Sequence, residues 1–220
     1  MLITFQTQAI LFDMDGVLIS STAADERSWL RWAVLHGMES TFSMQSTHGR
    51  RAVDTLAALR PDLDPAVEVA ILEDFDAEDL NGILILPGVE RLLASLPANR
   101  WTIVTSASHR LMVNRLGHAG LPSPRTIITA DMVVHGKPHP EPYLAGARAL
   151  DLDPKDCLVI EDAPAGVAAG KAAGCKVLAV LTSHTAEDLV GADWIIPNLD
   201  YVSVVVGADG LEIHLEARSR

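Results

Sequence analysis

The chain passes from four apolar residues to two acids and a glycine in the stretch AILFDMDG (residues 9–16). The apolar part is typical of a short buried strand. Asp13 and Asp15 are two residues apart, so on an extended chain their side chains would point to the same face. Two carboxylates held close together repel each other unless a cation or a shared proton offsets their charge. Taken alone, the stretch is most simply a solvated turn at a strand end.

Short apolar runs and helical segments alternate along much of the remaining chain. Further strands are expected at residues 101–105, 126–129, 157–160, 177–181 and 194–196. Helical segments between them, such as 108–119 and 164–173, predict parallel β-α-β units with helices on both faces of a sheet. The tail at 202–215, which surrounds a Gly-Ala-Asp-Gly turn, predicts a hairpin. We therefore expect an α/β fold with a doubly wound, Rossmann-like parallel sheet.

Residues 20–83 depart from this alternation because they contain helical segments and no convincing strand. Helices are expected at about 23–36 and 50–59, with a third that begins at Asp64-Pro65 and stops near Asn81-Gly82. We expect this segment to form an α-helical cap, inserted after the first predicted strand into a core made of residues 1–19 and 84–220.

The cap segment is acidic, and against that background the adjacent pair Arg50 and Arg51 stands out. The segment from Ser20 to Gly82 holds twelve Asp and Glu residues but five Arg. Such arginines are solvated or pair with acids in most proteins. The alternative is that one of them faces a substrate anion.

Composition excludes several classes of protein. The formal net charge of −12 argues against binding to nucleic acid, which needs a basic face. The first residues lack the basic start and apolar run of a signal peptide, and no stretch has the length of a membrane span. The two cysteines do not form a CxxC pattern. We expect a cytoplasmic protein that binds neither nucleic acid nor membrane, while a small phosphorylated substrate stays compatible with this charge.

Polar residues follow four of the predicted strands. In open α/β sheets, ligands bind beyond the carboxyl ends of the strands, where the strand order reverses. Those ends carry Asp13 and Asp15, then Thr105 and Ser106, then Lys137 in a Gly-Lys-Pro loop, then Glu161 and Asp162.

The chemistry of this set is coherent. Converging carboxylates imply a hard cation with oxygen ligands, and Mg²⁺ is the usual choice beside phosphate. Lys137 would balance negative charge on Asp13 and the substrate, and a hydroxyl could donate to a phosphoryl oxygen. A carboxylate nucleophile is known for phosphoryl transfer through an aspartyl-phosphate. The chain has no GxGxxG or Walker A pattern, which argues against a dinucleotide or nucleoside-triphosphatase site.

The order and spacing of DMDG, TSAS, GKPHPEPY and EDAPAGVAAGKAAGC resemble the haloacid dehalogenase superfamily, in the branch with a helical cap after the first strand. The motifs look closest to the glycerol-1-phosphatase and 2-deoxyglucose-6-phosphatase group, and β-phosphoglucomutase is a more distant likeness. The resemblance implies a Mg²⁺-dependent phosphatase that acts on a small sugar or polyol phosphate.

The resemblance also implies roles for the residues at the strand ends. Asp13 would be the nucleophile, and Asp15 would protonate the leaving group and then activate water. Mg²⁺ would be held by the Asp13 carboxylate, the Asp15 backbone carbonyl and Asp162, with Glu161 nearby or bridging through water. Ser106 matches the phosphate-binding hydroxyl better than Thr105 does, and Lys137 would orient the nucleophile and the transferring group.

Three other functions are weighed against this one. A sugar-phosphate mutase of the β-phosphoglucomutase type is disfavoured because Asp25 stands where that resemblance calls for a histidine. A phospho-accepting signalling domain also uses acids, a hydroxyl, Mg²⁺ and a Lys-Pro, but it is shorter and has no inserted helical block. A catalytically dead binding module is disfavoured because no motif residue is missing. We expect a monomer, since a capped enzyme with one site can work alone, and an oligomer stays open. The spacing does not fix which cap residues contact the substrate.

Overall fold

A parallel sheet of six strands lies at the centre of the computed structural model, which describes residues 2–43 and 49–216. The strand order is β6-β5-β2-β7-β8-β9. The strands are β2 (Ala9–Phe12), β5 (Trp101–Val104), β6 (Ile127–Ile128), β7 (Cys157–Glu161), β8 (Lys176–Val180) and β9 (Trp194–Ile196). From β2 the chain builds outward to β6 on one side and then, from β7, to β9 on the other. The strand order therefore reverses beside β2, and the predicted α/β sheet is confirmed.

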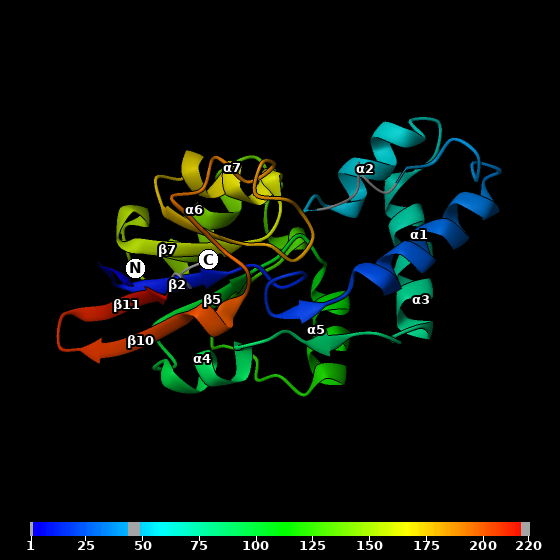
Figure 1. Ribbon diagram of the computed structural model, residues 1–220. Helices are drawn as coiled ribbons and strands as arrows, with labels where there is room; N and C mark the ends of the chain where they lie inside the picture. Colours follow the sequence, from blue (N-terminus) through cyan, green and yellow to red (C-terminus); the bar gives the residue numbers. More distant parts are fainter. Residues whose placement is uncertain (1, 44–48, 217–220) are drawn as a thin grey trace.

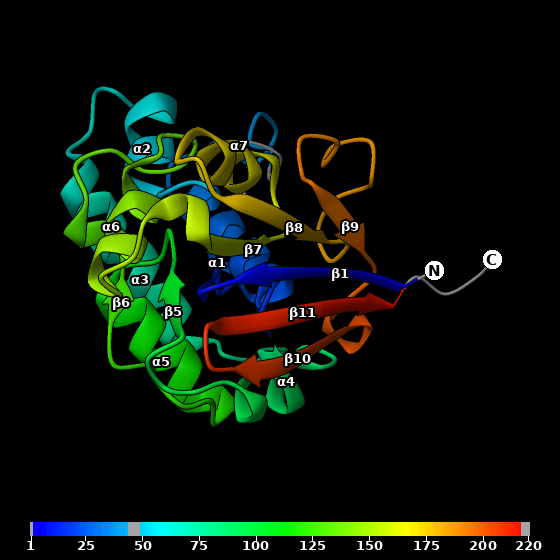
Figure 2. The same ribbon diagram turned by 90° about the vertical axis from the view of Figure 1, so that its left-hand side faces the viewer.

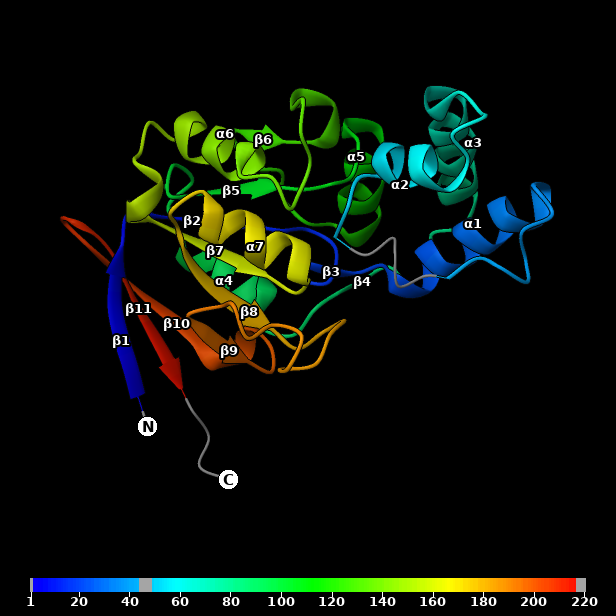
Figure 3. The same cartoon turned by 90° about the horizontal axis from the view of Figure 1, so that it is seen from above.

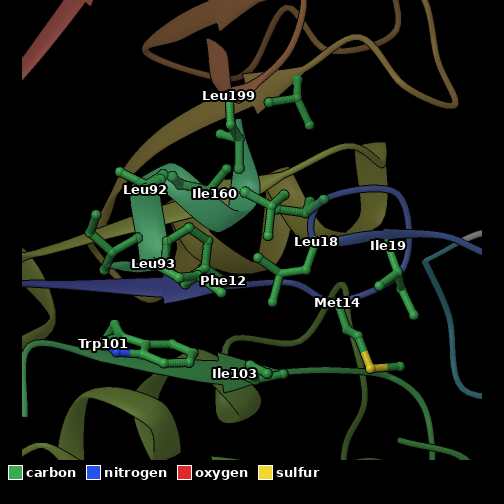
Figure 4. Packing of buried hydrophobic residues seen from close by; sticks show 14 of the residues in the cluster. Phe12, Met14, Leu18, Ile19, Leu92, Leu93, Trp101, Ile103, Ile160 and Leu199 are labelled. Carbon is green, nitrogen blue, oxygen red and sulfur yellow. The ribbon is translucent and has the colours of Figure 1, made fainter. Parts of the chain in front are cut away.

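Helices cover both faces of this sheet. This is required because successive side chains of β2 point to opposite faces and all of them are apolar. Ile10 and Phe12 belong to a core cluster with α4 (Val89–Ser95) and α5 (His109–Ala119), whereas Leu11 belongs to the cluster under α6 (Glu141–Ala149) and α7 (Pro164–Ala172). Figure 3 looks onto the face that α6 and α7 cover. Figure 4 shows the opposite face, where the Phe12 ring meets the edge of Trp101 at a centroid distance of 6.1 Å. Every residue of β2 is buried, so its side chains pack in two layers.

A second, antiparallel sheet holds the two ends of the chain together (Figure 2). Its strand order is β1-β11-β10, with β1 at Leu2–Thr7, β10 at Val202–Gly207 and β11 at Gly210–Glu216. The predicted hairpin in the tail is present, but β1 was not predicted. The strand before Asp13 is therefore the second in the chain, and the prediction that it is the first was wrong. The partner of Leu2 is Glu216, at the other end of the chain, so no local sequence pattern predicts this pairing.

In the described part of residues 20–83, three helices pack around a small apolar cluster of their own. They are α1 (Thr22–Leu35), α2 (Ala52–Leu59) and α3 (Pro65–Glu78), and their buried residues include Trp32, Leu56 and Leu72. The group lies to one side of the sheet in Figure 1. We call residues 20–83 the cap. A short antiparallel pair, β3 (Ile19–Ser20) with β4 (Leu84–Ile85), joins its two ends, and the division into cap and core stays a prediction.

The helix ends follow local chemistry. The Asp64 carboxylate accepts a hydrogen bond from the Ala66 backbone N–H at the start of α3, and the Ser108 hydroxyl accepts one from Leu111 at the start of α5. Short 3₁₀ helices are present at η2 (Ala130–Met132), η3 (Pro154–Asp156) and η4 (Leu199–Tyr201). In the described ranges, no helix is both long and apolar enough to cross a membrane.

Candidate active site

A cavity of about 410 Å³ opens between the cap and the carboxyl ends of the parallel strands. Its lining includes seven of the nine residues that the sequence predicts for the site, namely Asp13, Asp15, Arg50, Arg51, Thr105, Ser106 and Asp162. Trp29, Val69 and Leu72 line it from the cap. The volume lies in the range of pockets that hold small molecules. The strand-end residues are therefore brought to one place, at the reversal point of the sheet.

Lys137 lies behind the cavity wall and fixes the Asp13 carboxylate. Its Nζ donates to Asp13 Oδ1 at 2.8 Å, to Glu161 Oε1 at 2.6 Å and to the backbone oxygen of Val104 at 3.1 Å. Burial lowers the pKa of Lys137, but the charges of Asp13 and Glu161 outweigh it and raise that pKa above its ordinary value. All three N–H bonds of the ammonium group are used, so Lys137 orients Asp13 as a fixed cation.

Glu161 is the counter-charge on the other side of this lysine. Besides Lys137, its Oε1 accepts from the hydroxyl of Tyr143 at 2.7 Å, and its Oε2 accepts from the backbone N–H groups of Asp162 at 3.0 Å and Ala163 at 3.2 Å. The side chain is fully buried. Because both oxygens already accept two hydrogen bonds, the contacts favour a place beside a metal over direct ligation for Glu161.

The charges at the strand ends fit a divalent cation. Asp13, Glu161 and Asp162 each offer a carboxylate oxygen, and these oxygens lie within 4.8 Å of one another. Among the described residues, Lys137 is the cation that pairs with this group, through Asp13 and Glu161. Burial, reinforced by repulsion from Glu161, raises the pKa of Asp13 to about 7 and that of Asp162 well above its usual range. Two positive charges would complete the neutralisation, and oxygen ligands suit Mg²⁺.

A turn and a hydroxyl place Asp162 in this set. Gly16 has a φ of +83°, and a Cβ at that position would lie 1.8 Å from Asp162 Oδ2. Ser183 Oγ donates to the same oxygen at 2.5 Å. The chain therefore keeps space for one carboxylate oxygen at the turn after Asp15, and Ser183, in the loop after β8, orients that oxygen.

The two hydroxyls after β5 have different surroundings. Thr105 is buried, and its Oγ1 accepts from the backbone N–H of Ala107 at 3.0 Å. Ser106 lines the cavity and donates to the backbone oxygen of Gly49, a cap residue, at 3.1 Å. The side chain of Thr105 shapes its own loop, so the contacts favour Ser106 as the hydroxyl that meets a phosphoryl group.

The two adjacent arginines of the cap also differ. Arg51 donates from Nε and from one terminal nitrogen to Asp54, each at 2.7 Å, and also donates to the backbone oxygens of Val133 and Val134 at 3.0 Å. Arg50 lines the cavity and is exposed, and within 2–43 and 49–216 it makes no hydrogen bond or ion pair. Arg51 therefore pairs with an acid and ties the cap to the core, whereas Arg50 has no such partner among the described residues and is exposed at the cavity.

Asp15 contacts a residue that the sequence did not indicate. Arg115, on α5, is 3 % exposed and donates from Nη1 to Asp15 Oδ1 at 2.7 Å. Its Nη2 donates to Asp25 of α1 and lies 3.5 Å from Asp76 Oδ1 of α3. Burial raises the pKa of both cap carboxyls above the usual value, that of Asp76 to about 6, although Arg115 opposes the rise.

Sequence reasoning missed three residues of this site for different reasons. Ser183 lies shortly after β8, so reading the polar residues after that strand as well would have found it. Tyr143 is part of the GKPHPEPY motif but follows no strand. Arg115 lies within a helix, seven residues after its N-cap Ser108, where no strand-end rule applies.

Comparison with known proteins gives a consistent result. The family model described as haloacid dehalogenase-like hydrolase matches residues 7–174. Hexitol phosphatase A of Escherichia coli (strain K12) is 39 % identical over 208 residues, which cover 92 % of this chain and 96 % of the relative. Glycerol-1-phosphate phosphohydrolase 2 of Saccharomyces cerevisiae is 34 % identical over 216 residues, with 92 % and 86 % covered. The crystal structure of β-phosphoglucomutase from Clostridium difficile superposes with a TM-score of 0.75 at 25 % identity, with 89 % and 92 % covered.

Proposed function

Because the chain belongs to the haloacid dehalogenase-like hydrolase family and is a phosphoric monoester hydrolase, we propose that it dephosphorylates a small sugar or polyol phosphate through an aspartyl-phosphate. The observation that carries this proposal is the placement of Asp13. One of its oxygens accepts from the buried Lys137, and the residue lines the cavity. A carboxylate held in this way is positioned as a nucleophile. Relatives named for hexitol and glycerol phosphates support the substrate class.

The proposed reaction has two steps that use the same two aspartates. In the first, an oxygen of Asp13 bonds to phosphorus while the bond from phosphorus to the leaving oxygen breaks, and Asp15 gives that oxygen a proton. In the second, Asp15 takes a proton from a water molecule whose oxygen attacks phosphorus. This step frees Asp13 and releases inorganic phosphate.

The remaining residues would neutralise negative charge at the site and orient Asp13. Asp13, Asp162 and the backbone carbonyl of Asp15 would hold Mg²⁺, with Glu161 behind them. A bound Mg²⁺ supplies positive charge against the phosphoryl oxygens, which is the main requirement of phosphoryl transfer. Lys137 keeps Asp13 in place, since its contacts hold one carboxylate oxygen.

Two further groups would contact the phosphate ester. Ser106 would donate to a phosphoryl oxygen, in exchange for its contact with Gly49. Arg50, exposed at the cavity, would meet a second anionic or polar group of the substrate.

Replacement of the nucleophile tests the proposal. Asp13→Asn should lower phosphate release from glycerol 1-phosphate, a hexitol phosphate and p-nitrophenyl phosphate by about 1,000-fold or more. The circular dichroism spectrum should stay that of the wild type, since the two side chains have nearly the same volume. Activity of Asp13→Asn within a few-fold of the wild type would contradict the assignment.

The same assay separates hydrolysis from phosphate migration. The structural likeness to β-phosphoglucomutase gives a sugar-phosphate mutase as the second candidate. Against it, Asp25, which stands where the mutase likeness calls for a histidine, is engaged by Arg115 and by the Ser21 hydroxyl. With β-glucose 1-phosphate as substrate, a phosphatase accumulates inorganic phosphate, whereas a mutase accumulates glucose 6-phosphate.

A further inference from the structure

The guanidinium of Arg115 is buried at the boundary between core and cap, where it contacts three carboxylates from three different elements. Asp15 follows β2 in the core, Asp25 is on α1 and Asp76 is on α3. A buried guanidinium is costly unless it is paired, and its removal leaves its partners uncompensated. This single side chain therefore links the proposed acid Asp15 directly to two helices of the cap.

A second arginine of α5 contacts the cap but does not contact Asp15. Arg110 lies 2.7 Å from Asp74 and 3.6 Å from Glu73, both on α3, and half of its side chain is exposed. This pair joins α5 to the cap without touching Asp15. Arg115 differs because it is buried and because one of its partners faces the cavity.

The hydrogen bonds of the Arg115 group are incomplete. In the described part of the chain, Arg115 Nε and Asp76 Oδ1 are buried without a hydrogen-bond partner. Buried polar groups left in this way cost stability. The arrangement is therefore poor as a purely stabilising contact, which points to a role at Asp15.

We propose that Arg115 is a positioning residue that couples the seating of the cap to the orientation of Asp15, an inference that rests on the proposed function. Nη2 faces the cap and Nη1 faces Asp15, so the two contacts lie on one rigid planar group. When Asp25 and Asp76 are seated on Nη2, the plane of the guanidinium is fixed, and Nη1 then holds Asp15 Oδ1.

The second carboxylate oxygen of Asp15 stays available for the reaction. Over the described ranges no hydrogen bond reaches Asp15 Oδ2, and a quarter of the side chain is exposed at the cavity. If the cap moves away, Arg115 loses its contacts with the two cap carboxylates, and it then no longer holds Asp15 in a fixed orientation. The acid is then in place when the cap covers the substrate, which is a form of induced fit.

Two substrates with different leaving groups isolate this role. Nitrophenolate leaves without a proton, whereas the alkoxide of glycerol 1-phosphate needs one from Asp15. For Arg115→Gln we expect kcat on glycerol 1-phosphate to fall by about 10- to 100-fold, part of what a general acid supplies. The first-turnover release of nitrophenolate from p-nitrophenyl phosphate should change less than about threefold, and the KM for glycerol 1-phosphate should change little.

Arg110→Gln is the matched control, because it removes the exposed contact between α5 and α3 and leaves Asp15 untouched. It should alter neither substrate's rate by more than about twofold, since exposed ion pairs contribute little. Asp25→Asn keeps Arg115 and Asp15 but removes one of the two cap carboxylates that contact Arg115, so it should reduce kcat on glycerol 1-phosphate in the same selective way, by a smaller factor. Arg115→Lys, which keeps the charge but not the planar fork, should recover part of the loss.

Several outcomes would overturn the proposal. These are equal losses on both substrates for Arg115→Gln, no loss on either, or an Arg110→Gln variant that behaves like Arg115→Gln. If Arg115→Gln does not fold, as judged by circular dichroism, Asp25→Asn decides by the same selectivity. A wild-type protein inactive on both substrates would instead contradict the proposed function, and the role of Arg115 with it.

Discussion

Asp13 lies in an environment that opposes its own charge. Burial and the neighbouring Glu161 raise its pKa to about 7, while Lys137 acts in the other direction. A nucleophile must be ionised, so the site gains from any further positive charge that holds Asp13 in that form. The carboxylate that we propose as the nucleophile therefore lies where its negative charge is destabilising until a cation binds. This cost has a measurable consequence for stability.

The stability of the metal-free protein should fall with pH because of Asp13. Its pKa in the folded state lies above the unfolded value of 3.8, so the folded state binds this proton more tightly. The destabilisation is absent below about pH 4 and grows as the pH rises toward 7. Asp13→Asn removes it. In urea titrations with a chelator, the variant should gain stability over the wild type, and the gain should be about 2 kcal/mol larger at pH 8 than at pH 5.

Asp153→Asn is the control for this prediction. Asp153 precedes β7 at the opposite end of that strand from Glu161, and half of its side chain is exposed beside Lys155. Its substitution should not reproduce the pH-dependent gain. A gain for Asp13→Asn that is the same at both pH values would show that Asp13 is not the group responsible.

At the scale of elements, the site depends on how each strand ends. The chain after β2 turns sharply, and the Gly16 N–H donates to the Ile19 oxygen at 2.7 Å. The positive φ of Gly16 and its close approach to Asp162 bring the ends of β2 and β7 together. Neighbouring parallel strands lie about 4.8 Å apart, so carboxylates at their ends can share one cation.

Gly16→Ala should therefore reduce activity far more than a glycine substitution whose only cost is the positive φ of the backbone. Gly37, at the end of α1, also has a positive φ of +65°, but a Cβ there would meet nothing within 4 Å. Gly37→Ala should cost about 1 kcal/mol of unfolding free energy and leave phosphatase activity unchanged. Gly16→Ala should lower kcat/KM by about 100-fold or more, because its Cβ must displace Asp162. Similar activities for the two variants would contradict this account of the turn.

At the scale of the whole molecule, the cap completes a cavity that the sheet only begins. The core supplies Asp13, Asp15 and Asp162, while Arg50, Trp29 and Leu72 are among the residues that close the space from the cap. Arg51 and Arg115 connect the two parts in different places, one at the loop after η2 and one beside Asp15. On the proposed function, substrate choice depends on the cap, whereas the proposed reacting groups lie on the core.

Substitution of the two neighbouring arginines should have different effects, one on the stability of the fold and the other on substrate binding. Arg51→Met breaks the hydrogen bonds to Asp54, Val133 and Val134, so the free energy of unfolding should fall by about 2–3 kcal/mol. Arg50→Met should leave that free energy within about 0.5 kcal/mol, because surface substitutions are usually of this size. It should raise the KM for a sugar or polyol phosphate by about tenfold, equivalent to one lost contact. A reversed pattern would show that Arg51, not Arg50, meets the substrate.

Much of the core and its rim could be predicted because the signals are local. A buried strand shows as an apolar run, and its end shows as the polar residues that follow, so Asp13, Ser106 and Asp162 could be named from neighbouring residues. Glu161 was found in the same way, at the end of β7, and Lys137 was found in the Gly-Lys-Pro loop that follows β6. The strand β1 was missed because its partner β11 lies at the other end of the chain.

The sequence by itself determined the α/β class, the strand ends and the carboxylates, lysine and hydroxyl that gather there. Tertiary structure alone decided that Arg51 bonds to Asp54 and to backbone oxygens of the core, and that Arg115 joins Asp15 to the cap. Asp15 and Asp25 are 100 and 90 positions away from Arg115 in the chain. Strand-end chemistry follows from adjacent residues, but the pairing of a helix side chain with two other elements depends on how those elements pack, and no local pattern encodes that packing.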